Sequence, residues 1–161
     1  MSKITNFQTI VKSITLTVPA DTYAGGDVLA DSQQVTILSA VPPQGMRGSI
    51  IYTQLLDQDD NSFNTDIVYF DSNVSLGTEG SAVSITDSNA EKILGVVRFA
   101  SSWKDLTNSQ VNSVNHNPIP FNISNSGDLY VGAIIREIGT VGVADKLYLT
   151  VGFVIDSIAI S

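Results

Sequence analysis

The stretch Ser13-Ile14-Thr15-Leu16-Thr17-Val18 alternates polar and apolar residues, and this alternation decides the fold class. Successive side chains of a β-strand point to opposite faces, so Ile14, Leu16 and Val18 are expected to share one face. Isoleucine, valine and threonine together make up 47 of the 161 residues. These β-branched residues are stiff at χ1 and pack well on a pleated surface. The sequence therefore predicts an all-β protein.

Further segments with strand character follow at close spacing, separated by turn residues such as the pair Pro42-Pro43. About eight strands in this length fit an antiparallel, jelly-roll-like β-sandwich, in which one sheet folds onto another. We expect residues 1–12 to form an N-terminal arm and residues 13–161 to form a single β-sandwich domain. Strands are expected, in addition to residues 13–18, at residues 35–41, 47–56, 66–71, 96–100, 119–123, 129–135 and 146–155.

One short helix is predicted over about residues 87–94. Thr86 and Asp87 are candidate N-caps, and Gly95 stands where a left-handed C-cap belongs. Residues 108–117 contain four asparagines and few apolar anchors, so they are expected to form the longest exposed loop.

The composition excludes several classes of function. The chain has no cysteine, which excludes disulfides and thiolate metal sites, and its one histidine excludes a histidine-rich metal site within one chain. Sixteen acidic residues against eight basic ones give a net charge of −8, which argues against a nucleic-acid partner. Apolar stretches such as Val151–Ile155 are far shorter than the roughly 18 residues of a spanning helix, so no membrane partner is expected either. The N-terminus lacks the pattern of a secretory signal, and we expect synthesis in a cytoplasm.

An acidic turn is the best candidate for a metal site. Calcium takes oxygen ligands from closely spaced aspartate and asparagine side chains, although this segment lacks the glycine and glutamate of an EF-hand loop. The same residue types form ordinary hairpin turns by bonding their own backbone. This second interpretation is favoured, so we expect the protein to have no cofactor. The candidate residues are Asp57, Asp59, Asp60 and Asn61. A second candidate metal cluster, Asp66 with Asp71 and Asn73, flanks a short apolar run, and solvated strand ends are again the favoured interpretation.

No catalytic motif accompanies the single histidine. His116 could act as a general base, but the sequence contains no Gly-x-Ser-x-Gly nucleophile elbow. An exposed loop histidine is the favoured interpretation, and we expect a protein that is not an enzyme.

Five apolar residues are candidates for an interface. Trp103 could anchor a partner or stack on a sugar ring, but a core or rim position is the favoured interpretation. Phe7 and Ile10 near one terminus, and Ile158 and Ile160 near the other, lie where unpaired strand edges could meet a second subunit.

Three segments carry a resemblance to a known class of protein. Tyr23-Ala-Gly-Gly-Asp-Val-Leu-Ala-Asp31, Leu55-Leu-Asp-Gln-Asp-Asp60 and the run from Val68 to Gly95 resemble small virion structural proteins of tailed bacteriophages. Some proteins of this kind are capsid decoration, or cement, proteins. The resemblance covers residues 14–100 well and residues 129–153 loosely.

This resemblance implies a structural role on the outside of a phage head. Cement proteins sit at junctions between capsomers, commonly as trimers, so the major capsid protein and further copies of the chain are the implied partners. Other positions in the virion, such as a tail, neck or head-fibre component, remain open as alternatives. So does a carbohydrate-binding module, for which Trp103, Tyr23 and a calcium-binding turn are the expected features.

Overall fold

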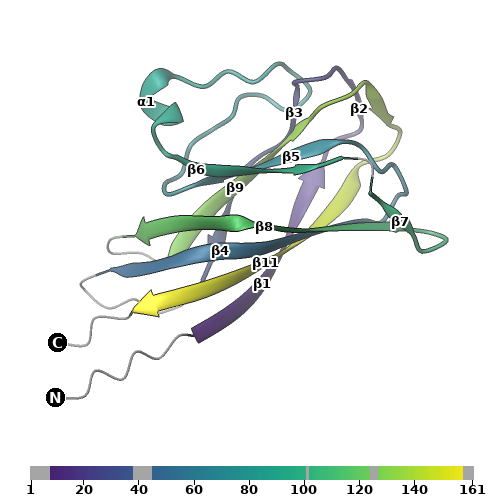
Figure 1. The fold of residues 1–161 in the computed structure, drawn as a ribbon. Helices are drawn as coiled ribbons and strands as arrows, with labels where there is room; N and C mark the ends of the chain where they lie inside the picture. The colour runs from purple at the N-terminus through teal and green to yellow at the C-terminus, as the bar shows by residue number, and fades with distance from the viewer. Residues whose placement is uncertain (1–7, 38–44, 101, 124–126, 158–161) are drawn as a thin grey trace, which may run out of the picture.

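The computed structural model describes residues 8–37, 45–100, 102–123 and 127–157, and it contains two antiparallel β-sheets packed face to face (Figure 1). The five-stranded sheet has the order β1 (Gln8–Val18), β11 (Asp145–Ser157), β4 (Met46–Asp57), β8 (Gln110–Ile123) and β7 (Lys104–Asp105). The four-stranded sheet has the order β3 (Val28–Thr36), β9 (Asp128–Ile135), β5 (Thr65–Phe70) and β6 (Ile93–Phe99). Two short strands, β2 (Asp21–Tyr23) and β10 (Gly139–Val141), pair with each other.

The eight longer strands pair in a nested order. The first pairs with the last (β1 with β11), the second with the seventh (β3 with β9), the third with the sixth (β4 with β8) and the fourth with the fifth (β5 with β6). The chain is therefore one long hairpin folded onto itself, and the pairs β11–β4 and β5–β9 join its parts into two sheets. This strand order is that of a jelly roll, which confirms the predicted fold class.

The core lies between the two sheets and follows the predicted alternation. Leu16 and Val18 are buried in it, and Ile14 packs against it half-buried. β5, which matches the strand predicted at residues 66–71, is hydrogen-bonded on both sides, and all of its residues are buried.

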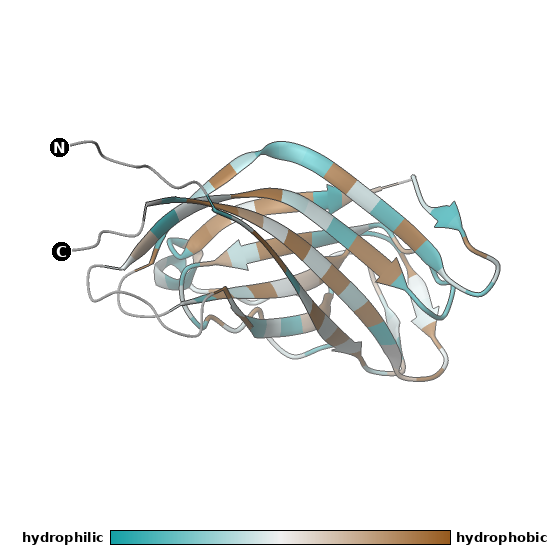
Figure 2. Ribbon diagram, turned by 90° about the horizontal axis from the view of Figure 1, so that it is seen from below, coloured by the Kyte–Doolittle hydropathy of each residue, from teal (hydrophilic) through white to brown (hydrophobic). Residues whose placement is uncertain are grey.

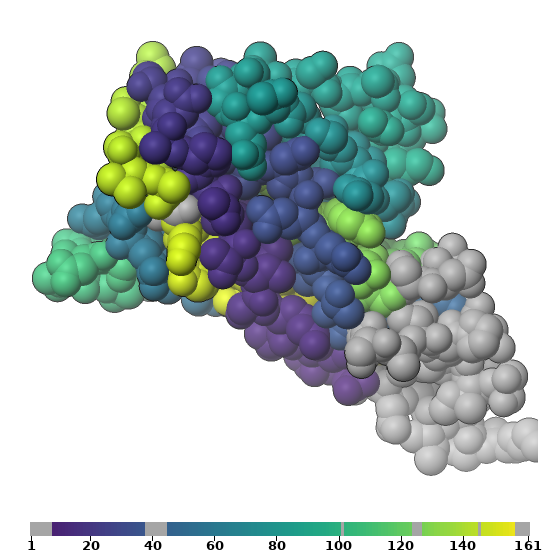
Figure 3. Space-filling view, turned by 180° about the vertical axis from the view of Figure 1, so that it is seen from behind, coloured from purple at the N-terminus to yellow at the C-terminus, as the bar shows by residue number. Residues whose placement is uncertain are grey.

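Residues 71–86 cover the outer face of the four-stranded sheet. Because side chains alternate along β5, Val68 and Phe70 point away from the main core. They form a second apolar cluster with Val74 and Leu76 of the covering segment. Figure 3, seen from behind, shows this part of the chain in teal above β1 in purple.

The helix is shorter than predicted. α1 spans Asp87–Ala90, and Thr86 is its N-cap, with a side chain that accepts a hydrogen bond from the backbone N–H of Asn89. The expected extension to residue 94 is wrong, because Ile93 and Leu94 already belong to β6. Gly95 is not a C-cap but lies opposite Tyr69 of β5. Pairing along β5 outweighs the weak local preference for helix.

The predicted loop at residues 108–117 is also wrong, since most of it lies in β8. The register between β4 and β8 steps from Tyr52 opposite Asn115 to Ile50 opposite Ile119. Residues 116–118 therefore bulge out of the ladder beside Ile51. Proline cannot donate to a ladder, and a bulge is one of the places where a strand tolerates it. The loop-like sequence thus marks a bulge within a strand.

Residues 8–12, expected in an N-terminal arm, lie in β1, where Lys12 is opposite Val151 of β11. Residues 1–7 of that arm lie outside the described ranges. Within those ranges, no helix has the length and apolar content needed to cross a bilayer.

Candidate functional site

The acidic turn is organised around one buried carboxylate. Asp57, at the end of β4, is 1% exposed, and its Oδ1 accepts a hydrogen bond of 2.9 Å from the backbone N–H of Asp59. Its Oδ2 accepts hydrogen bonds of 2.9 Å from the backbone N–H groups of Asn61 and Ser62. Asp57 is therefore a turn-forming residue. Asp59 and Asp60 are exposed. Among the described residues, no three histidine, aspartate or glutamate side chains lie close enough together to hold a metal ion.

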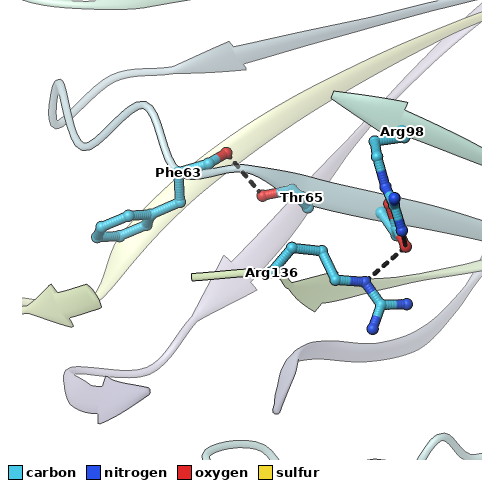
Figure 4. Close-up of polar contacts among 5 residues, drawn as sticks. Phe63, Thr65, Arg98 and Arg136 are labelled. Atoms are coloured by element: carbon cyan, nitrogen blue, oxygen red, sulfur yellow. Dashed lines mark hydrogen bonds and ion pairs between the residues drawn. The ribbon is translucent and has the colours of Figure 1, made fainter. Parts of the chain in front are cut away.

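Asp66 is a buried ion-pair centre, so its interpretation as a solvated strand end is wrong. Its Oδ1 accepts a hydrogen bond of 2.7 Å from Arg98 Nε, and its Oδ2 accepts one of 2.6 Å from Arg136 Nε (Figure 4). Burial acts to raise the pKa of Asp66, but the hydrogen bonds and charges of the two guanidinium groups outweigh it and hold that pKa below its usual value. Both arginines remain partly exposed.

His116 belongs to a series of hydrogen-bonded polar groups that runs into the core, so its interpretation as an exposed loop residue is wrong. The ring lies at the β8 bulge, and its Nε2 is 3.0 Å from Thr53 Oγ1. Thr53 is wholly buried, and its Oγ1 is also 2.9 Å from the hydroxyl of Tyr69 in the opposite sheet. The Nδ1 of His116 lies 2.8 Å from the carbonyl oxygen of Asn117.

Trp103 lies at the edge of the core, as its favoured interpretation expects. Its indole is half-buried, with its centroid 6.5 Å from that of the Phe99 ring. In the described part of the chain, the Nε1 of Trp103 is buried and meets no hydrogen-bond acceptor. The indole lines an internal cavity of about 10 Å³, as do Asp57 and Thr65. A cavity of that size holds about one water molecule.

The other apolar candidates differ in position. Ile10 lies in β1 and packs half-buried against the core. Phe7, Ile158 and Ile160 lie outside the described ranges. Tyr23, considered for sugar stacking, is wholly buried, and its hydroxyl donates to the carbonyl oxygen of Pro19, so it is not available to an external ligand.

The outer face of the five-stranded sheet carries an uncharged surface, whose position the sequence alone does not give. We call it the neutral face, and Figure 2 shows this sheet from below, with hydropathy alternating along its strands. The pairing of β1, β11, β4 and β8 places four residues side by side in each of four successive rows. The rows are Thr9, Val154, Ser49 and Pro120; Val11, Gly152, Tyr52 and Asn115; Ser13, Thr150, Gln54 and Ser113; and Thr15, Tyr148, Leu56 and Val111.

Charges begin only at the borders of the neutral face. Lys146 stands opposite Thr17 beyond one end, Arg47 stands opposite Asn122 beyond the other, and Lys104 lies on β7 at the side. Charged residues make up 15% of this chain, so about two or three would be expected among the sixteen positions of these rows, and none is present. The surface is therefore depleted of charge. The signal in the sequence is the uncharged alternate positions of four strands, which become one surface only when the register is known.

Three solved capsid structures are similar to this chain over nearly its whole length. A chain of the heated full particle of Israeli acute paralysis virus matches at 11% identity and a TM-score of 0.38, covering 96% of this chain and 72% of that one. A chain of the acid-stable capsid of Helicobacter pylori bacteriophage KHP30 matches at 11% identity and a TM-score of 0.30, covering 94% and 95%. A chain of the cyanophage Pam1 capsid matches at 10% identity and a TM-score of 0.32, covering 96% and 88%. No protein-family model and no curated protein matches the chain. The assignment of a jelly roll rests on the strand pairing of this chain itself.

Proposed function

We propose that this chain is a non-enzymatic virion structural protein that decorates the outside of a phage head and stabilises the shell at capsomer junctions. The observation that carries the proposal is the neutral face, and the resemblance of residues 14–100 to small phage virion proteins supports it. In this proposal the neutral face contacts the major capsid protein.

The chemistry of the neutral face suits a broad protein contact. Charged residues are depleted at the centres of protein interfaces, because burying an unpaired charge costs several kcal/mol, of order 3–5. Tyr52 and Tyr148 supply aromatic rings, which are frequent among the residues that dominate binding energy. Ser13 Oγ and Thr150 Oγ1 are paired at 2.9 Å across two strands, and the Tyr52 hydroxyl donates to Gln54, so covering these groups leaves them matched.

A homotrimer would strengthen such a contact. Three linked copies present three neutral faces to a junction of three capsomers, and the second and third contacts then form at high effective concentration. Analytical ultracentrifugation of the purified chain tests this part of the proposal, which requires a mass of three chains.

The shell contact is tested by placing one charge in the middle of the neutral face. Gln54 accepts a hydrogen bond from the Tyr52 hydroxyl at its Oε1, and Gln54→Glu keeps that acceptor while adding a negative charge. The matched control is Gln34→Glu, at an exposed position of β3 in the other sheet. Binding is measured by co-sedimentation with empty expanded heads of the phage that encodes the chain.

We expect saturable binding of the wild type and of Gln34→Glu, and binding at least tenfold weaker for Gln54→Glu. A monomeric wild type that does not bind the heads contradicts the proposal. Binding to tails or necks instead, seen by imaging of particles, would assign the chain to that part of the virion. Equal binding of all three proteins would show that the neutral face is not the contact.

A further inference from the structure

A polar hollow lies at one end of the sandwich, away from the neutral face. It is formed by the segment between β4 and β5, the residues just before β7 and the turn between β9 and β10, and its volume is about 550 Å³. The hollow is wide and open to solvent, unlike the enclosed pockets that bury most of a small ligand. Two aromatic rings, Phe63 and Trp103, line it, together with the amides of Asn61 and Asn64 and the carboxylate of Glu137.

The two rings form a fixed wall. Phe63 and Trp103 line both the hollow and the internal cavity, so they separate the hollow from the core. The Phe63 ring packs directly on Gly139, where only a glycine leaves room for it, since a Cβ on Gly139 would lie 2.4 Å from Cε1 of that ring. The rings are therefore held by packing before any ligand arrives, which lowers the entropic cost of binding.

The polar side of the hollow is held in place as well. The carboxylate of Glu137 accepts a hydrogen bond of 2.6 Å from the backbone N–H of Asn64 and one of 3.3 Å from its side-chain Nδ2. Ser62 adopts a positive φ of 50°, and Asp60 one of 61°, in the turn that the Asp57 carboxylate organises. Such backbone conformations are costly for residues other than glycine and persist only where the surroundings enforce them.

We propose that this hollow binds a neutral saccharide. A sugar ring has a face of C–H groups that can lie against an aromatic ring and an edge of hydroxyl groups that both donate and accept hydrogen bonds. Phe63 and Trp103 match the face, while the amides and the carboxylate match the edge. The formal charge in the lining is the carboxylate of Glu137, and the chain carries a net charge of −8, so an anionic ligand is disfavoured.

Trp103 allows a direct test because it is the only tryptophan of the chain. The full chain is titrated with glucose, galactose, mannose, N-acetylglucosamine and the β-1,4-linked disaccharides of glucose and N-acetylglucosamine. Trp103 fluorescence and the ¹⁵N–¹H spectrum of the labelled protein are recorded together. At least one sugar is expected to give saturable changes confined to residues 61–64, 103 and 137–138.

Two variants test the role of the indole. Trp103→Ala is expected to weaken sugar binding at least tenfold, as measured by calorimetry. Trp103→Phe keeps a ring against Phe99 and is expected to weaken binding less, which keeps the test decisive if the alanine variant does not fold. Asn115→Ala, on the neutral face, is the control and is expected to bind the sugar as the wild type does.

The remaining outcomes each overturn the proposal. One is that none of these sugars changes the spectra at 100 mM. Another is that the changes lie outside the hollow, and the third is that calcium chloride alone causes them. Gln54→Glu is expected to keep sugar binding, so the saccharide site and the proposed shell contact can fail independently.

Discussion

Thr53 joins the two sheets through a single hydroxyl. A carbonyl oxygen only accepts, so the contact with Asn117 assigns a proton to His116 Nδ1. In this tautomer the Thr53 hydroxyl donates to Nε2. The oxygen of Thr53 in turn accepts from the hydroxyl of Tyr69. Burial raises the pKa of Tyr69 far above its ordinary value, which keeps that hydroxyl a donor.

Replacing Thr53 by valine keeps the shape but removes the shared hydroxyl. Tyr69 and His116 each lose a partner, and a buried polar group without a partner costs about 1–3 kcal/mol. We expect Thr53→Val to lower the free energy of unfolding by that amount, measured in urea through Trp103 fluorescence. The control is Thr150→Val on the neutral face, with an expected change within about 0.5 kcal/mol. Equal stability of the two variants would contradict this account.

Asp66 gives stability that depends on pH. Its pKa is lowered in the folded protein, so its ion pairs contribute fully above the unfolded value of about 4, and the contribution is lost as the pH falls through the folded value. We expect Asp66→Asn to be less stable than the wild type at pH 7, by roughly 1–3 kcal/mol. The difference should shrink below about pH 4, as measured by urea unfolding at a series of pH values. A difference that stays constant with pH would rule out the ion pairs as its cause.

At the scale of elements, the covering segment, residues 71–86, is tied to β3 by several hydrogen bonds. They include backbone bonds of Val28 with Gly80 and Ser81, and the carboxylate of Asp31 adds two more. Asp31 Oδ1 accepts a hydrogen bond of 2.7 Å from the backbone N–H of Leu76, and Oδ2 accepts one of 2.8 Å from Ser75 Oγ. Gly132 makes room beneath, since a Cβ there would lie 2.5 Å from Leu76 Cδ1. The segment thus protects the outer face of the four-stranded sheet, where an exposed apolar patch would invite aggregation.

Asp31→Ala is expected to loosen the covering segment without unfolding the sandwich. Amide hydrogen exchange should accelerate around residues 75–77 at least tenfold, while the amides of β4 and β11 keep their protection. Asp105→Ala is the control, because Asp105 is exposed and its carboxylate accepts from Thr107 within its own turn. Faster exchange throughout the molecule would contradict a local role.

The elements that the sequence predicts well are those whose alternation matches their surroundings. β4, β11 and the second half of β1 turn alternate residues toward the core between the sheets, so the period of two is visible in the sequence. In β8, only residues 119–123 are predicted as a strand. Residues 110–118 resemble a loop because Asn115 and Asn117 are exposed, Asn112 is a buried polar residue, and Pro118 lies in the bulge. The same holds for the site residues: those whose role is local can be predicted. Asp57 is an example, because an aspartate that bonds its own backbone in a turn is recognisable from neighbouring residues alone. The neutral face and the hollow depend on register and on contacts between distant segments, which no single stretch of sequence contains.

On the scale of the whole molecule, the nested pairing makes almost every sheet contact distant in sequence. More than a hundred residues separate β1 from β11, although the two strands are paired along their whole common length. Folds dominated by such contacts must close long loops early and fold slowly. We expect refolding from urea, followed by Trp103 fluorescence in a stopped-flow instrument, to take milliseconds to seconds. Refolding within microseconds would contradict the nested order of assembly.

Because the first strand pairs with the last, β1 has no partner strand during most of the synthesis of the chain. A ribosome adds about 5–20 residues per second, so β1 is made on the order of ten seconds before β11 exists to pair with it. During that interval its apolar side chains and unpaired backbone are open to any strand nearby, including those of neighbouring nascent chains. In a heavily translating cell, expression of this chain should depend on chaperones that occupy β1 until β11 emerges.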